Sequence, residues 1–444
     1  MTSQLDTCER VLANLPAAAE AEVTVMTGTE SLTRFATGFI HQNVADALQR
    51  VHLRLAMDGR VAEVTGNQTD EAALQRLARS ALDAAALQPV DSAWPGLAAP
   101  ADAPPVEHWD PATAEAPPVE RAGRVGAFVA AAGGLETAGF CSTEGVEVAF
   151  ANSAGQRLTG RTSLAMLDGI ARTPTSDGSA RAASVRLDDL DGAVIGAEAA
   201  RRARAGAQVS DLGPGRYEVV LSPSCVVNVL GFLAIHGFNA RAVDEGRSFA
   251  RLGETQFDPS ISLADDVGHP LATGVPFDAE GTPKVRLDLV RDGVTTGLVH
   301  DRRTARALGA ESTGNAIEGA GTLGALPANL VLAAGSSSPD ELVAAMGRGL
   351  LVTDLWYTRI LDPRTQVVTG LTRNGVWLVE DGRIQRPVAN LRFTQSFLEA
   401  LGPGNVRGVG SDLTLVGGAV FGIGAYVVPS LHLASWNFTG GAKG

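Results

Sequence analysis

The sequence predicts an α+β protein with an N-terminal α/β domain (residues 1–210) and a C-terminal β-rich, antiparallel domain with few helices (residues 211–444). Its 444 residues exceed the usual size of one hydrophobic core, so two domains are expected. The 51 glycines and 22 prolines indicate many turns, which favours mixed or β-rich architecture. Helical patterns lie mainly before residue 211, whereas short strands and turns follow it.

The N-terminal elements follow from hydrophobic periodicity. Strands are expected over residues 22–26 and 33–41, and over 51–57 and 60–65, where Asp58-Gly59 indicates a hairpin turn. Further strands are expected at residues 138–143, 146–152 and 157–167, and helices at 74–82, 119–132 and 192–205. The eight prolines within residues 89–118 exclude a regular helix or central strand, so we interpret this segment as a long surface loop.

The C-terminal domain is expected to open with a strand that ends at Leu221, followed by a helix over residues 224–240. Beyond it, Asp292-Gly293 and Asp381-Gly382 indicate two hairpins. Their strands are expected at residues 285–290, 294–300, 376–380 and 383–386. Residues 416–429 are apolar and glycine-rich, which is consistent with buried strands that bend.

Charge and cysteine content exclude several classes of function. A formal net charge of −13, without a basic run, argues against binding to nucleic acid. The three widely spaced cysteines argue against a disulfide framework and for a reducing compartment. No signal-peptide pattern is visible and no apolar run reaches about 18 residues, so we expect no membrane partner and a cytoplasmic location.

One buried helix is the best candidate position for a functional site. Ser222 or Ser224 can cap its N-terminus, and Pro223 suits its first turn. Residues 225–235 are apolar almost all round, which is typical of a helix enclosed on every side. His236 is therefore expected at the end of a rigid element.

Three blocks of the sequence resemble the TldD/PmbA peptidases: Gly231–Asp266, Glu311–Ala316 and Leu351–Leu401. The resemblance implies an N-terminal α/β domain, a β-rich C-terminal domain and a complex of two related subunits. In the catalytic, TldD-type subunit it implies HExxxH on this helix and a cysteine late in the chain. The histidines and the cysteine would bind zinc there, and the glutamate would act as general base.

This chain departs from that motif at most of its positions. His236 is present, but Gly237 replaces the glutamate, Arg241 replaces the second histidine, and no cysteine follows Cys225. Arginine offers no lone pair and repels a cation. The chain therefore resembles the partner subunit, TldE or PmbA. We assign it no catalytic residue and no metal ligand, we expect no cofactor in it, and we expect zinc in the partner subunit only.

The candidate site-lining residues are His236, Asn239, Arg241 and Glu245, and two interpretations of them stay open. His236 can be a structural residue at a helix C-terminus, which is favoured, or a functional one. Arg241 and Glu245 can form a surface ion pair worth a few tenths of a kcal/mol or contact substrate. We also expect a loop formed by residues 311–316 and 319–324 to lie near the helix end, where its backbone amides could contact a peptide.

Trp356, Tyr357 and Arg359 form a second candidate group in a chain with 5% aromatic residues. Strand alternation would turn Leu355 and Tyr357 to one face and Trp356 to the other. A core position is favoured. Aromatic residues beside arginine are also typical of interfaces, so a subunit contact or a substrate channel stays open.

The leading hypothesis is a non-catalytic subunit of a TldD/TldE-type zinc metallopeptidase that acts on unfolded or modified peptides. Its partner would be a homologous TldD-type subunit in a heterodimer. The alternative is a stand-alone hydrolase or tailoring enzyme for a small amide, with His236 as base and Arg241 as anion clamp. A third possibility is a self-associating binding module without a catalytic partner.

Overall fold

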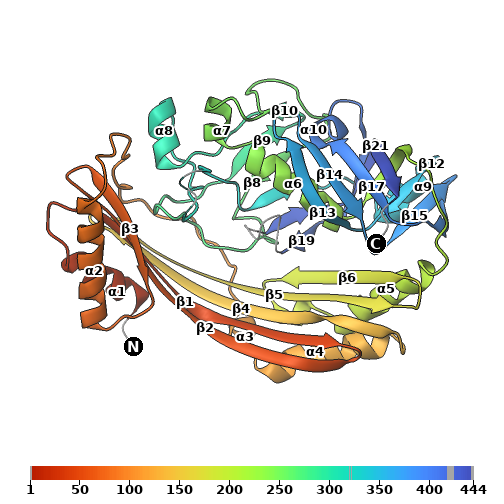
Figure 1. Ribbon diagram of the computed structural model, residues 1–444, viewed down its shortest axis with the longest axis horizontal. Coiled ribbons are helices and arrows are strands. Elements are labelled where there is room, and N and C mark those ends of the chain that lie inside the picture. Colours follow the sequence, from red (N-terminus) through yellow and green to blue (C-terminus); the bar gives the residue numbers. More distant parts are fainter. Residues whose placement is uncertain (1–2, 320, 322, 418–424, 442–444) are drawn as a thin grey trace.

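The computed structural model describes residues 3–319, 321, 323–417 and 425–441, and it has the expected α+β architecture. A long, curved antiparallel sheet from the first half of the chain lies beneath a β-rich C-terminal part that holds two further sheets (Figure 1). The predicted fold class is thus confirmed. Within the described ranges, no helix combines the length and the apolar composition that crossing a membrane requires.

The first sheet has six strands in the order β3-β2-β1-β4-β5-β6, and all of its pairings are antiparallel. The strands are β1 (Glu20–Ala36), β2 (Phe39–Met57), β3 (Arg60–Gly66), β4 (Glu136–Asn152), β5 (Arg157–Arg172) and β6 (Asp177–Ser184). The hairpin at Asp58-Gly59 is confirmed, with the two positive φ angles (52° and 71°) that a type I′ turn requires.

Two strand predictions in this sheet were wrong. The segment 33–41 is not one strand, because Thr37 and Gly38, both with positive φ, turn the chain from β1 into β2. The two strands expected over residues 138–152 are one continuous strand. A Cβ on Gly145, which lies between them, would stand 2.4 Å from the Cβ of Ala114, so this glycine allows close packing and does not interrupt the strand.

Helices cover one face of the first sheet, and the other face is turned toward the C-terminal part (Figure 1). Alternate residues of the strands account for this arrangement. Val23 and Cys141 pack under the helices, whereas Val146 and Phe150 pack against Phe277 of the C-terminal part. The helices are α1 (Gln4–Ala13), α2 (Glu71–Ala86), α3 (Pro111–Ala114), α4 (Pro118–Ala131) and α5 (Gly192–Ala205), with a 3₁₀ turn η1 (Leu187–Asp189).

The proline-rich segment is irregular apart from the short helix α3, as expected for a surface loop. It also contacts the C-terminal part. Asp91 forms an ion pair with Arg303, whose Nη1 lies 3.1 Å from its Oδ1, and Arg302 donates to the carbonyl of Leu97.

The C-terminal part has a nine-stranded sheet in the order β13-β14-β17-β21-β7-β12-β15-β16, with β18 paired to β21. Its strands are β7 (Gly215–Leu221), β12 (Arg348–Val352), β13 (Leu355–Asp362), β14 (Val367–Thr372), β15 (Val376–Glu380), β16 (Arg383–Pro387), β17 (Leu391–Ser396), β18 (Val406–Val409) and β21 (Leu431–Gly441). The hairpin predicted at Asp381-Gly382 is confirmed. The pairing is antiparallel except between β7 and β12, which are parallel.

A six-stranded sheet in the order β10-β9-β8-β11-β20-β19 lies across the core from it. Its strands are β8 (Leu263–Asp265), β9 (Leu287–Arg291), β10 (Val294–Thr295), β11 (Leu330–Leu332), β19 (Thr414–Val416) and β20 (Tyr426–Val428). The hairpin at Asp292-Gly293 is present, but β10 is much shorter than the expected strand over 294–300. The prediction for residues 416–429 lies partly outside the described residues.

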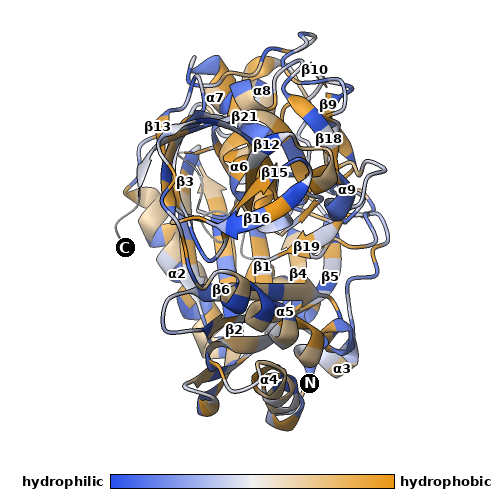
Figure 2. Cartoon of the chain, turned by 90° about the vertical axis from the view of Figure 1, so that its right-hand side faces the viewer, coloured by the Kyte–Doolittle hydropathy of each residue, from blue (hydrophilic) through white to orange (hydrophobic). Residues whose placement is uncertain are grey.

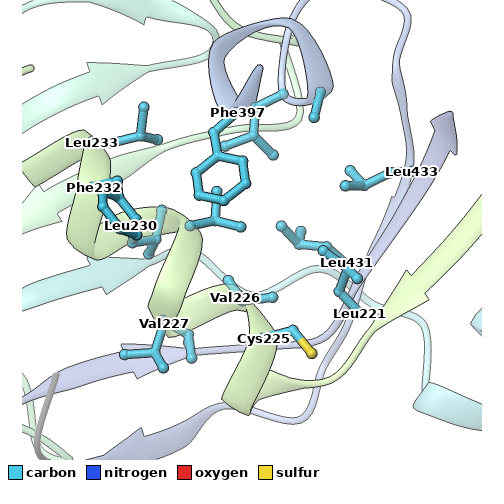
Figure 3. Packing of buried hydrophobic residues seen from close by; sticks show 14 of the residues in the cluster. Leu221, Cys225, Val226, Val227, Leu230, Phe232, Leu233, Phe397, Leu431 and Leu433 are labelled. Atoms are coloured by element: carbon cyan, nitrogen blue, oxygen red, sulfur yellow. The ribbon is translucent and has the colours of Figure 1, made fainter. Parts of the chain in front are cut away.

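Helix α6 (Pro223–His236) runs through the core between these two sheets. Figure 2 shows it as a largely hydrophobic segment enclosed by strands, and Figure 3 shows side chains of α6 packed against Leu221, Phe397, Leu431 and Leu433. The remaining helices, α7 (Ala240–Asp244), α8 (Arg302–Leu308), α9 (Pro339–Ala344) and α10 (Phe397–Ala400), are short.

A buried ionic cluster joins the first sheet to the C-terminal part. Arg54 of β2 forms ion pairs with Glu22 of β1 (2.6 Å) and with Glu280 (3.0 Å), and Asp278 lies close by. Each of the three carboxyl groups belongs to a residue that is at most 5% exposed. Burial raises the pKa of Glu22 to about 7 against the attraction of Arg54, and it raises the pKa of Asp278 to about 7, with Glu280 adding to that rise.

This cluster makes stability depend on pH. Folding raises the pKa of the Glu22 carboxyl group from 4.5 to about 7. Between pH 4.5 and about pH 7 this group therefore binds more protons in the folded state than in the unfolded state. The free energy of unfolding therefore falls as pH rises from about 5 to 8. We expect Glu22→Gln to reduce that fall by about 1–2 kcal/mol, but not to abolish it, because Asp278 remains.

Urea denaturation at pH 5.5 and pH 8.0 measures this difference. The exposed-carboxylate variant Glu107→Gln is the control and should keep the slope of the parent protein. If the free energy of unfolding changes between these two pH values in Glu22→Gln as much as in the parent protein, Glu22 is not the group responsible.

Candidate functional site

Helix α6 (Pro223–His236) is shorter than the helix predicted over residues 224–240. Ser222 is the N-cap residue, as expected, and Pro223 occupies the first turn, but the Ser222 hydroxyl donates to the carbonyl of Thr353 (2.7 Å) and does not cap a helix amide. The helix ends at His236, with Gly237 as C-cap. Asn239 is the N-cap residue of α7, which begins at Ala240, so the expected helix is two helices.

Gly237 occupies a position that has no room for a side chain. A Cβ there would lie 2.3 Å from Cε1 of the Phe249 ring and 2.4 Å from the carbonyl oxygen of Leu233. Phe249 is held in place by Phe238 and Phe257, whose rings lie 5.7 Å and 6.0 Å away. The position at which the resemblance places a glutamate is therefore next to an aromatic ring that leaves no room for a side chain.

His236 is half-buried and its ring stacks on that of Phe232, with centroids 6.3 Å apart and planes at 16°. Burial lowers the pKa of His236, and the positive charge of Arg247 lowers it further. The imidazole is thus neutral near pH 7. A neutral imidazole can accept a proton or a metal ion, but either role needs partners.

Asn239 is a structural residue in this arrangement. It is 2% exposed, and its Oδ1 accepts hydrogen bonds from the amides of Arg241 (3.0 Å) and Ala242 (3.4 Å), which caps α7. Its Nδ2 donates to the carbonyl of Leu323.

Arg241 and Glu245 form the ion pair that their spacing indicated, with Nε 2.9 Å from Oε1. A second donor of Arg241, Nη1, binds the carbonyl of Gly321. Glu245 also accepts from Arg247, and hydrogen bonds from both arginines lower its pKa. Arg241 thus fixes the loop beside the helix end, and a contact with substrate stays a prediction.

Of the loop expected near the helix end, residues 321, 323 and 324 lie there. In the 311–316 segment, Asn315 and Ala316 donate instead to Asp265 and Asp278. The carbonyls of Gly321 and Leu323 accept from Arg241 and Asn239, and a Cβ on Gly324 would come within 3.0 Å of Oδ1 of Asn239. Residues 320 and 322 are outside the described part. In these residues the loop contacts the protein through its carbonyl groups. Whether its backbone amides bind a peptide stays a prediction.

The donors at this site do not fit zinc. A zinc site uses three or four His, Cys, Asp or Glu ligands, and across the described ranges no group of three such residues is placed to hold a metal ion. Arg241 is tied to Glu245 and Gly321. Cys225 is buried within α6, where its thiol donates to the carbonyl of Val352 (3.4 Å) and burial raises its pKa. We therefore derive no metal-dependent step for this chain.

The second candidate group lies on β13, and its predicted core position is wrong. Leu355 is buried, but Trp356 and Tyr357 are 53% and 62% exposed. Alternation fails because Tyr357 has a φ of 55° and the register shifts between Trp356 and Arg359. The strand packs on the site helix, since the hydroxyl of Thr358 donates to Oδ1 of Asn228 in α6 (3.2 Å).

Hydrophobic periodicity gave no sign of the contact that closes the helix end. Ser248 donates to the carbonyl of Gly237 (2.6 Å), and the next residue, Phe249, blocks the space beside that glycine. Their separation of more than ten residues carries no periodic signal. Both residues belong to EGRSF (Glu245–Phe249), which lies in the first block that resembles the family, and that resemblance was the only signal in the sequence that could mark them.

Because there is no room for a Cβ at Gly237, any side chain at this position should destabilise the fold. We expect Gly237→Ala to lower the free energy of unfolding by about 1–3 kcal/mol, because the methyl group would overlap Phe249 and the helix backbone. The control is Gly126→Ala in α4, where a Cβ meets no atom within 4 Å and helix propensity favours alanine. Equal stability of the Gly237→Ala variant and the parent, by urea denaturation, would contradict the packing.

Comparison with known proteins agrees with the earlier resemblance. Residues 214–440 match the model of the PmbA/TldA metallopeptidase C-terminal domain. A metalloprotease of Methanothermobacter thermautotrophicus is 29% identical over 209 residues, which cover 45% of this chain and 44% of that protein. Metalloprotease PmbA of Escherichia coli O157:H7 is 25% identical over 256 residues, 54% of this chain and 50% of its own length. The matched region thus spans about half the length of these relatives.

Solved structures share the fold over nearly the whole chain. TldE from Thermococcus kodakarensis has a TM-score of 0.87 at 18% identity, covering 98% of this chain and 99% of that one. A Thermotoga maritima protein described as a putative modulator of a DNA gyrase has a TM-score of 0.86 at 20% identity, with the same coverage. Since the family model matches half of the sequence and the fold agrees throughout, the chain belongs to the PmbA/TldD metallopeptidase family.

Proposed function

We propose that this chain is the non-catalytic, TldE-like subunit of a two-subunit zinc metallopeptidase that acts on unfolded or modified peptides. The observation that carries the proposal is the closed position at Gly237, where Phe249 occupies the space that a general base would need. The unsuitable donor set at His236 and Arg241 supports it further.

The chemistry would come from a homologous, TldD-type partner that carries HExxxH and the late cysteine and holds the zinc. This chain would supply a rigid helix end, a fixed loop beside it and a sheet face without helices, all of which can help to enclose a peptide. Its role would be to restrict access to extended chains. Its acidic charge and its predicted cytoplasmic location are compatible with such a complex.

The alternative of a stand-alone amide hydrolase is favoured by one observation, the lowered pKa of His236, which leaves a neutral base at pH 7. It is weakened by Arg241, because two of the donors of this proposed anion clamp already bind Glu245 and Gly321. The partner role accounts for both residues without a second function.

Zinc analysis and a peptidase assay test the leading proposal. We expect the purified chain alone to hold no stoichiometric zinc and to leave an unstructured peptide intact. Co-expressed with an HExxxH-bearing homologue, it should co-purify, and the complex should bind zinc and cleave the peptide. One tightly bound zinc ion per isolated chain would overturn the proposal.

A single substitution separates the two functions. His236→Ala should leave the peptidase rate of the reconstituted complex unchanged within about twofold, because under the proposal the partner subunit supplies the general base and the zinc. Circular dichroism would establish that the variant folds. A loss of turnover of 100-fold or more, with the complex intact, would favour the hydrolase alternative.

A further inference from the structure

A cationic aromatic surface lies at the edge of the nine-stranded sheet. We call it the β13 patch, and its residues are Trp356, Tyr357, Arg359, Leu361, Arg373 and Arg392. The patch lies outside the helix end discussed above, on the strand that packs against α6. Three strands contribute to it or flank it: β13, the end of β14 and β17.

The backbone of β13 is distorted in a way that exposes the aromatic side chains. Tyr357 has a φ of 55°, which a bulky L-residue rarely adopts and which costs about 1 kcal/mol or more. A regular strand would have turned one of the two neighbouring rings into the core. Here both Trp356 and Tyr357, and also Leu361 (59%), are exposed to solvent.

An arginine covers each ring. The guanidinium carbon of Arg373 lies 4.3 Å from the centroid of Trp356, and that of Arg359 lies 4.5 Å from the centroid of Tyr357. Stacking fixes the guanidinium planes and leaves their N–H edges open to carboxylates. Within the described part of the chain, neither arginine forms an ion pair with a carboxylate of the protein.

Arg392 adds a third positive charge on the same face. Leu371 of β14 stands opposite both Trp356 and Arg392 in the strand registers, so these three residues form one row across the sheet. Arg392 is exposed, and no described carboxylate pairs with it. The patch is thus locally positive on a chain whose net charge is −13.

A cavity of about 550 Å³ adjoins the patch through Arg373. Asn374, Val388 and Asn390 line it from the C-terminal part, and Thr173 and Ser176 line it from the turn between β5 and β6. Its size lies in the usual range for ligand sites. Its walls mix hydroxyl, amide and apolar groups with Arg373 and with Arg172 and Asp177, which form an ion pair with each other. A segment bound on the patch can continue into this cavity.

The distortions of β13 also indicate how a partner would bind. Register shifts at residues 356–359 and 360–362 break the regular edge that an added strand would need. Recognition therefore depends on side chains: apolar groups would pack on the exposed aromatic surface, and carboxylates would accept from the three arginines.

We propose that the β13 patch and the adjoining cavity form a binding site for an extended peptide segment that carries carboxylate side chains. The site lies entirely on this chain, so the proposal does not require a catalytic partner. A short segment is favoured over a whole subunit because the site combines a few anchors with a cavity of limited volume, whereas a stable subunit contact buries about 800 Å² per partner.

Fluorescence anisotropy with the full chain tests the proposal. The probe is a labelled, unstructured twelve-residue peptide rich in Glu and Asp with two leucines, and a peptide with Lys at the acidic positions is its control. We expect at least tenfold tighter binding of the acidic peptide, weakening as salt is raised. Arg359→Gln, Arg373→Gln and Trp356→Ala should each weaken binding at least fivefold.

Arg79→Gln, in α2 at the left of Figure 1 and away from β13, is the matched control and should bind as the parent does. Circular dichroism and urea denaturation establish that each variant folds. Equal affinity for both peptides, or full binding by the arginine variants, would overturn the proposal. Variants that bind the peptide normally but no longer co-purify with the homologous subunit would overturn it in favour of a subunit interface.

Discussion

The C-terminal part is organised around a helix that has no polar face. Strands of both sheets pack against α6, including β7 and β13 on one side and β19 and β20 on the other. Each fully buried Val, Leu or Phe on it contributes about 1.5–3 kcal/mol relative to exposure, so the helix is stable only when covered on all sides. Its sides are thus excluded from any contact with a ligand, and only its ends can meet one.

That enclosure explains the character of the candidate site. The end at His236 is held by two segments, the turn that carries Ser248 and Phe249 and the loop that carries Gly321 and Leu323. Nearly every polar group there has a partner within the protein. The arrangement is therefore rigid, and the polar side chains of Asn239, Arg241 and Glu245 are already bound within the protein.

Much of the architecture could be predicted from local sequence. Helix α5 coincides with the predicted range 192–205, and the turn at Asp58-Gly59 lies where its dipeptide indicated. Local patterns failed where the cause was tertiary. Gly145 accommodates Ala114 from a distant helix, and Tyr357 adopts a left-handed conformation that no propensity indicates. For the site, the loss of the motif was visible in the sequence, but the ring that closes the position was not.

The contact between Gly237 and Phe249 has a consequence for how this sequence can change over time. Restoring the motif glutamate at residue 237 would place its side chain inside the space of the Phe249 ring. Removing the ring first would leave a cavity among the packed residues Phe238 and Phe257. Either first step is harmful, and only the two together could be neutral, as expected for contacting residues. A lineage that has reached this state therefore cannot regain a glutamate at residue 237 through neutral single substitutions, and the packing of one ring keeps the sequence at this position from changing back.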